Sequence, residues 1–236
     1  MDGTDDVVDH GDFLADSLTT LSMVVGVNPQ TLTAGRTFWG WGTTAGNGFV
    51  FGVASTNTLL IFSWWTNETE SAISTNAVFS TNTPTVVGFI YDGTQTGNSN
   101  RCRLFANGTS IAVSYSGTVP ANLGTPAGNV LVAQGRKLHA GYFGGIIGPS
   151  KMWIAGLTNS ELIQEMQSPY PYRRRNLVGF WPYTDGVYAR DYSGSGNHGT
   201  VTGARTAGGP PQIPRPQRFI AQKHRHGGLG LWGHRV

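Results

Sequence analysis

Four aspartates, Asp2, Asp5, Asp6 and Asp9, stand close together at the start of the printed sequence. Carboxylates are hard oxygen ligands of the kind that Ca²⁺ prefers in proteins. Because the four residues are near neighbours in sequence, a single loop can bring them around one cation. An acidic turn at the start of a strand explains the same pattern, and both interpretations stay open. We therefore expect no cofactor unless these carboxylates bind calcium.

Tryptophan side chains offer a second kind of chemistry, because flat aromatic rings stack on the faces of sugars. Trp39 and Trp41 lie in one short apolar segment and are the candidate sugar contacts. Trp64 and Trp65 are adjacent, so in a strand they point to opposite faces of the sheet and at least one of them packs in the core. Core packing is the favoured interpretation for most of these four tryptophans.

The sequence lacks the pair of suitably spaced carboxylates that glycoside hydrolysis needs. A glycosidase places two carboxylic acids around the scissile bond, typically presented on one strand as Glu-x-Asp-x-x-Glu. The chain has only four glutamates, Glu68, Glu70, Glu161 and Glu165, and none stands in that pattern. The serines of Tyr192–Gly196 sit in a Gly-rich turn without the strand-to-helix elbow of a nucleophilic serine. The sequence therefore predicts a protein that is not an enzyme.

The elements that must position these residues are mainly strands. Charged residues make up 12% of the 236, and Gly contributes 34 positions. That composition is far from the composition of amphipathic helices, which need many Glu, Lys and Leu residues. Short apolar runs instead alternate with turn residues, which is typical of an all-β sandwich or barrel. The predicted strands span 21–27, 37–41, 48–53, 59–65, 86–91, 103–106, 110–115, 129–133, 142–148, 151–155 and 176–181.

Two turns and one helix have specific signals. Asp92-Gly93 and Asn107-Gly108 supply the positive φ angles that tight hairpins require. Thr158-Asn-Ser-Glu161 is a capping box, so the sequence predicts one short helix that begins there and ends before Pro169. We expect this helix to close an edge or an end of the sandwich.

The chain divides into four parts by composition. Residues 1–168 form the predicted jelly-roll body, 169–175 a stiff basic connector, and 176–204 a strand and a loop that complete the sandwich. Residues 205–236 form an arm rich in Pro, Gly, Arg and His, with too few apolar residues to fold alone. We therefore expect the arm to bind another surface.

Charge is unevenly distributed along the chain. Residues 1–100 contain one Arg and nine acidic residues, whereas residues 101–236 contain 15 Lys or Arg and four acidic residues. Opposite potentials steer association, so this division favours attraction between copies or between parts of the chain. The basic residues follow no nucleic-acid reading helix or base-stacking module, and we predict no specific nucleic-acid partner.

Three further classes of feature are absent from the sequence pattern. No run of 18 apolar residues occurs, so we expect no membrane partner. Met1 is followed by acidic residues, which does not resemble a secretion signal. Cys102 is the one cysteine, so no disulfide can form within the chain, and stability must come from packing or assembly.

Several segments together resemble the laminin-G-like, concanavalin A-like jelly-roll family. Residues 2–11 are similar to the family's "DGTDDYVDLG", and residues 176–182 with 191–200 closely resemble "GLVGYWPFDEG…DYSGNGNHGTL". The segments 21–29, 86–108 and 142–163 add weaker matches, and the resemblance covers about residues 1–205. It implies an antiparallel jelly-roll sandwich with one short helix and an extended C-terminal arm. Many members of this family bind calcium.

The order of these segments departs from the family pattern. The match at 176–200 usually precedes the match at 2–11, whereas here it follows the other segments. Segment 176–204 either completes its own sandwich, as in a circular permutation, or is swapped onto a neighbouring copy. We favour the first interpretation. A truncated second repeat is a third, less attractive one, because so few residues cannot readily form their own core.

The resemblance and the arm lead to two functional hypotheses. The first is a non-catalytic structural or decoration protein of a phage virion or a similar assembly. It would dock on other copies of itself or on a capsid or tail protein, with anchors at Arg215, Arg218, Phe219, Arg225 and Trp232. The alternative is an extracellular carbohydrate-binding, lectin-like module whose partner is a glycan and which depends on calcium.

Overall fold

The computed structural model describes residues 1–42, 48–54, 60–64, 70–126, 128–134, 141–184 and 188–205. Trp65 and the five residues predicted as anchors of the arm lie outside these residues, as does the side chain of Trp64; the five are Arg215, Arg218, Phe219, Arg225 and Trp232.

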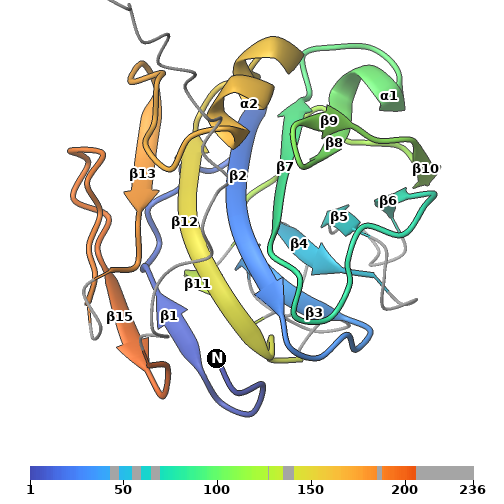
Figure 1. Ribbon diagram of the computed structural model, residues 1–236. Helices are drawn as coiled ribbons and strands as arrows, with labels where there is room; N and C mark the ends of the chain where they lie inside the picture. Colours follow the sequence, from blue (N-terminus) through green and yellow to red (C-terminus); the bar gives the residue numbers. More distant parts are fainter. Residues whose placement is uncertain are drawn as a thin grey trace, which may run out of the picture.

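Two antiparallel sheets form a sandwich over the described part of the chain (Figure 1). The larger sheet has nine strands in the order β10-β6-β5-β4-β3-β11-β1-β15-β14, and the smaller has six in the order β13-β12-β2-β7-β8-β9. The strands of the larger sheet are β1 (Val7–Asp9), β3 (Arg36–Trp41), β4 (Phe49–Val53), β5 (Leu60–Trp64), β6 (Ser71–Ser74), β10 (Val113–Ser116), β11 (Val130–Val132), β14 (Tyr188–Ala189) and β15 (Gly199–Thr202). Those of the smaller sheet are β2 (Thr20–Pro29), β7 (Thr85–Asp92), β8 (Cys102–Ala106), β9 (Thr109–Ser110), β12 (Gly145–Trp153) and β13 (Leu177–Trp181). The predicted all-β jelly-roll class is confirmed.

The main core lies between the two sheets and is rich in aromatic rings. Phe89 on β7 contacts Phe49, Phe51 and Phe62 of the opposite sheet, with ring centroids 5.7, 4.9 and 4.6 Å away. All four side chains are fully buried. Each such side chain contributes about 1.5–3 kcal/mol through burial, so these inward-facing rings hold the sheets together.

Two helices occur among the described residues. α2 (Asn159–Met166) begins at the predicted capping box, which is confirmed: Glu161 N donates to Thr158 Oγ1 at 3.2 Å and Thr158 N donates to Glu161 Oε2 at 2.8 Å. α1 (Asn98–Arg101) was not predicted, because four polar residues give no helical periodicity. Neither described helix is long and apolar enough to span a membrane.

α2 lies on the outer face of the smaller sheet, against β2 and β7, rather than at an edge or an end (Figure 1). Leu162 and Met166 of the helix pack there with Val24, Ile90 and Trp153 in a second buried cluster. The smaller sheet is thus covered on both faces.

Three local predictions are wrong. Asp92-Gly93 is no two-residue hairpin, since β7 is followed by α1, and Gly93 has no positive φ, unlike Asn107 and Gly108. The predicted strand 110–115 divides into β9 and β10, which belong to different sheets. The strands predicted at 142–148 and 151–155 are one strand, β12, whose register shifts between Ile147 and Ser150. A bulge at Pro149 fits a residue that cannot donate a ladder hydrogen bond.

Segment 176–204 contributes to both sheets. β13 pairs with β12 in the smaller sheet, whereas β15 pairs with β1 and with β14 in the larger sheet. Within this chain, the first and last described strands are therefore neighbours. Segment 176–204 therefore supplies the strands that pair with β1 and β12, and without it each of these strands would have an unpaired edge.

Candidate functional site

Three of the four predicted calcium-binding aspartates meet in the structure. The carboxylates of Asp2, Asp5 and Asp6 offer oxygen atoms within 4.8 Å of one another. Asp6 is buried and accepts a hydrogen bond from the backbone N of Asp2, while Asp2 and Asp5 are exposed. Calcium binding by this cluster stays a prediction, and a thermal shift on adding Ca²⁺ and then EDTA tests it.

Asp9 has a different place from the other three aspartates. Its carboxylate accepts hydrogen bonds from Asn129 Nδ2 at 2.9 and 2.8 Å and from Gly11 N at 2.8 Å. These bonds tie the end of β1 to the residue before β11. The structure therefore gives Asp9 a structural role and does not place it in the aspartate cluster.

Trp39 and Trp41 are fully buried, so the prediction that they stack on sugar is wrong. Residues two apart in a strand share a face, and in β3 that face looks into the sandwich. Trp39 Nε1 donates to Ser150 Oγ at 3.3 Å, and its ring packs on Trp181 at 4.8 Å. Trp41 Nε1 donates to Asp12 at 3.4 Å. Both rings are core residues.

The exposed aromatic side chains are tyrosines that the sequence reasoning missed. Among the described residues, the large exposed apolar side chains are Tyr170, Tyr172, Tyr188 and Tyr192. Tyr170 and Tyr192 both contact the ring of the buried Phe180 in T-shaped geometry, with centroid distances of 6.0 and 6.5 Å. We call Tyr170, Phe180 and Tyr192 the tyrosine platform. Tyr170 is 65% and Tyr192 49% exposed, so both rings are accessible to a ligand.

Tyr192 is held by the loop that covers the outer edge of β13. Its N donates to Phe180 O at 2.8 Å, and Phe180 N donates to Asp191 Oδ1 at 2.9 Å. Further along the same edge, Asn197 Nδ2 donates to Val178 O at 2.7 Å. Loop 191–197 thus occupies backbone groups that an edge strand would otherwise expose. This gives the family-like motif at 191–200 a structural reason.

Tyr170 is held by a rigid backbone and a buried ion pair. Pro169 and Pro171 restrict the chain on both sides of it, and its N donates to Ser168 Oγ at 3.1 Å. Beneath this segment, Lys151 Nζ of β12 donates to Glu165 Oε2 and to Ser168 O, each at 2.9 Å. The tyrosine therefore projects from a fixed support.

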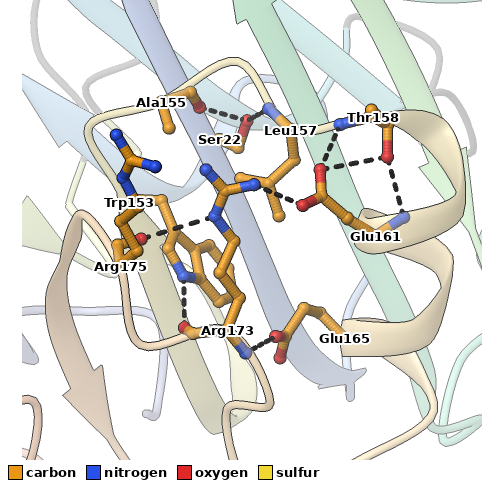
Figure 2. Close-up of polar contacts among 9 residues, drawn as sticks. All are labelled: Ser22, Trp153, Ala155, Leu157, Thr158, Glu161, Glu165, Arg173 and Arg175. Atoms are coloured by element: carbon orange, nitrogen blue, oxygen red, sulfur yellow. Dashed lines mark hydrogen bonds and ion pairs between the residues drawn. The ribbon is translucent and has the colours of Figure 1, made fainter.

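The segment predicted as a basic connector is fastened to α2 and β12 (Figure 2). Glu165 accepts hydrogen bonds from the N atoms of Tyr172 and Arg173, at 3.2 and 2.6 Å. The Arg173 guanidinium pairs with Glu161, and Trp153 Nε1 donates to Arg173 O at 2.9 Å. The pKa of Glu161 is held below its ordinary value, first by the hydrogen bond from Thr158 N and also by Arg173. Arg173 is thus used inside the fold, whereas Arg174 and Arg175 are exposed.

His10, near the start of the chain, is buried against residues from the last part of the described chain. His10 is 5% exposed, and its Nδ1 lies 3.2 Å from Asn197 O while its Nε2 lies 3.4 Å from the hydroxyl of Tyr183. Trp181 Nε1 donates to the same Asn197 O at 2.7 Å. Burial lowers the pKa of His10 to about 4, so the ring is neutral at pH 7.

No family model matches the chain, and no curated protein matches it. Solved structures do match. A protein from Bacteroides ovatus whose description proposes carbohydrate binding aligns at 16% identity and a TM-score of 0.65, over 90% of this chain and 60% of that one. The native heptameric SAP-like pentraxin of Limulus polyphemus aligns at 13% identity and 0.53, over 73% and 82% of the two chains.

Another similar structure is domain 4 of AbnA, a GH43 extracellular arabinanase from Geobacillus stearothermophilus, in complex with arabinotriose. It aligns at 18% identity with a TM-score of 0.51, over 71% of this chain and 75% of that one. At these identities the likeness concerns the fold alone. The chain has the jelly-roll sandwich of pentraxins and carbohydrate-binding domains, with an exposed tyrosine platform at one edge of its smaller sheet.

Proposed function

We propose that this protein binds a carbohydrate without hydrolysing it, and that the tyrosine platform is the contact surface. The observation that carries the proposal is the pair of exposed rings, Tyr170 and Tyr192, set around Phe180. Aromatic faces stack on the apolar faces of sugar rings. The fold supports the proposal because it is shared with the structures of carbohydrate-binding proteins.

The support of the platform also suits a binding role. Tyr170 is flanked by two prolines, and Tyr192 is tied through its backbone to β13. A ligand that meets rings already held in place loses less free energy to ordering the protein.

The test is a glycan array followed by titration calorimetry with the best ligands. Tyr170→Ala and Tyr192→Ala are each expected to weaken binding about tenfold, which corresponds to about 1.4 kcal/mol of lost contact. Tyr188→Ala is the matched control, because Tyr188 is 61% exposed but lies in the other sheet, with Arg190 near its ring at 5.8 Å. Full binding by both platform variants would contradict the proposal.

A second proposal concerns assembly through the arm, residues 205–236. The observation that favours it is charge: the arm has six Lys or Arg and no acidic residue, whereas nine acidic residues and one Arg lie in residues 1–100. Such a division suits contact between the arm and another copy or a capsid or tail protein, as in a virion component. Deletion of residues 206–236 is then expected to lower the native mass or to abolish association with particles. Unchanged assembly would contradict this second proposal.

A further inference from the structure

The surface beside the tyrosine platform carries positive charge that the fold does not use. Residues 168–184 contain three arginines and no acidic residue. Of the three, Arg173 pairs with Glu161. Arg174 and Arg175 are exposed, and neither side chain makes an ion pair or a hydrogen bond with another described residue. Two neighbouring guanidinium groups are thus free to meet a ligand.

These arginines come just before β13, the edge strand that carries Phe180 of the platform. Leu177 N, at the start of β13, donates to Arg174 O at 3.2 Å, so a tight turn joins the arginines to the strand. Ser195 Oγ approaches Leu177 O at 3.5 Å, which brings the loop that follows Tyr192 to the same end. Phe180 is three residues beyond Leu177, which places it about 10 Å along the strand from the end that the arginines precede. An oligosaccharide of a few units is long enough to touch both places.

We infer that the ligand of this surface is an anionic oligosaccharide. One sugar ring stacks on Tyr170 or Tyr192, and a carboxylate or sulfate of a neighbouring unit pairs with Arg174 and Arg175. A guanidinium binds either anion through two parallel hydrogen bonds, which gives both affinity and orientation. The inference rests on the proposed carbohydrate binding and specifies its ligand.

Charge and aromatic content distinguish this surface from a neutral sugar site. A neutral glycan offers nothing to compensate two adjacent cations, whereas an acidic glycan does. A protein partner is the other class that Tyr and Arg surfaces attract. We favour the glycan because the two exposed rings contact a single buried ring and give a small contact area. Self-association is therefore measured as a separate outcome.

The experiment measures binding of the full chain to three probes: a heparin-derived hexasaccharide, an oligogalacturonate hexamer and neutral maltohexaose. The first two distinguish sulfate from carboxylate recognition. The test variant is Arg174→Ala/Arg175→Ala. Its matched control is Arg190→Ala/Arg205→Ala, which removes the same charge from two exposed arginines elsewhere in the chain. Far-ultraviolet circular dichroism and the Tm check that both variants fold.

We expect the wild type to bind at least one acidic probe and to bind maltohexaose more weakly. The test variant is expected to lose about tenfold or more in affinity, and the control variant less than about twofold. The affinity of the wild type is expected to fall as the salt concentration rises from about 0.05 to about 0.5 M.

Preference for maltohexaose would overturn this inference and leave carbohydrate binding in place. Absence of binding to every glycan on an array would overturn both. Equal losses of affinity in the two variants would overturn the inference in favour of nonspecific charge attraction. A dimer that dissociates only in the test variant would overturn it in favour of a protein interface.

Discussion

His10 stacks on Trp39 with ring centroids 5.0 Å apart and an angle of 16° between the planes. Trp181 packs against both rings, with its centroid 4.6 Å from that of His10 and 4.8 Å from that of Trp39. The three rings come from the first and last parts of the described chain and from β3 in the middle of the larger sheet. The histidine thus acts as a neutral aromatic ring in the core, although it can carry a proton.

The first prediction is that His10 makes stability depend on pH. In the folded protein its pKa is about 4, mainly because burial disfavours the charged ring, against 6.5 in the unfolded chain. Asp191 and Asp9 oppose this shift and His198 reinforces it. Between pH 6.5 and 4 the unfolded state binds more protons, so stability falls as pH falls, by about 3 kcal/mol in total.

Urea unfolding at several pH values measures this dependence. His10→Gln removes the titrating group, so its free energy of unfolding is expected to vary less between pH 6.5 and 4 than that of the wild type. The comparison concerns the slope, because the substitution also removes ring stacking at every pH. Equal slopes for the two proteins would contradict the prediction.

The second prediction concerns the buried ion pair under the tyrosine platform. Lys151 and Glu165 side chains are 1% and 2% exposed, and their charged atoms are 2.9 Å apart. Burial is the largest influence on Lys151 and lowers its pKa, while Glu165 opposes that shift. Glu165→Ala leaves the ammonium buried without its partner, so we expect a loss of about 3–5 kcal/mol in urea unfolding.

Two controls separate the charge from the hydrogen bonds. The ion pair between Glu161 and Arg173 is more exposed, since 37% of the Glu161 side chain and 28% of the Arg173 side chain are accessible. Glu161→Gln weakens this pair and should lower the free energy of unfolding by less than about 1 kcal/mol. Glu165→Gln keeps one oxygen acceptor for the N atoms of Tyr172 and Arg173, so it should retain more glycan binding than Glu165→Ala. If Glu165→Ala were no less stable than Glu161→Gln, the ion pair would have no structural role.

The third prediction concerns Asp191, which organises the loop at the edge of β13. Its two carboxylate oxygens accept hydrogen bonds from Phe180 N, Ser193 N, Ser193 Oγ and Asn197 N, at 2.8–3.0 Å. Asp191→Asn replaces one acceptor oxygen with a donor, which leaves a buried N–H opposed by another N–H. We expect a loss of about 1.5–3 kcal/mol.

The same substitution should also affect the edge of the sheet. When the loop is loosened, the backbone of β13 becomes available to other strands, so Asp191→Asn is expected to aggregate faster on warming. Light scattering during a thermal ramp measures this, with Ser193→Ala as a control that removes one donor and leaves the carboxylate in place. Identical aggregation of both variants would argue against the loop as a cover for the edge.

The sequence predicts those features of the fold that depend on neighbouring residues. The short apolar runs locate most strands, and Thr158 and Glu161 locate the start of α2, because a capping box is satisfied within one turn. The division at residues 111–112 was not visible, since β10 leaves the smaller sheet to pair with β6, more than thirty residues away. The pairing between β10 and β6 determines which sheet contains β10, and neighbouring residues do not reveal it.

The candidate site was missed for a similar reason. Tyr170 and Tyr192 are 22 positions apart in the sequence, and they share a site only because both contact Phe180 of β13. The tryptophans that looked accessible share the inward face of β3, and a single sequence does not show which face of a strand is inward. The repeated tyrosines and prolines of residues 169–172 are the signal that could have pointed to an exposed, rigid segment.

The last prediction concerns Gly179, which directly precedes the buried aromatic residues Phe180 and Trp181 on β13. A Cβ placed there would come within 1.8 Å of the Trp181 ring, a distance that no packing tolerates. Trp181 cannot move freely, because its Nε1 is bonded to Asn197 O and its ring packs on Trp39. Gly179→Ala is therefore expected to displace Trp181 and to lower the free energy of unfolding by about 1–3 kcal/mol or more through overpacking.

Gly26→Ala in β2 is the matched control, since the nearest atom to its added Cβ is an ordinary 3.9 Å away. Tryptophan fluorescence and urea unfolding measure both effects, and a Gly179→Ala protein as stable as Gly26→Ala would show that Trp181 is not held where the structure places it.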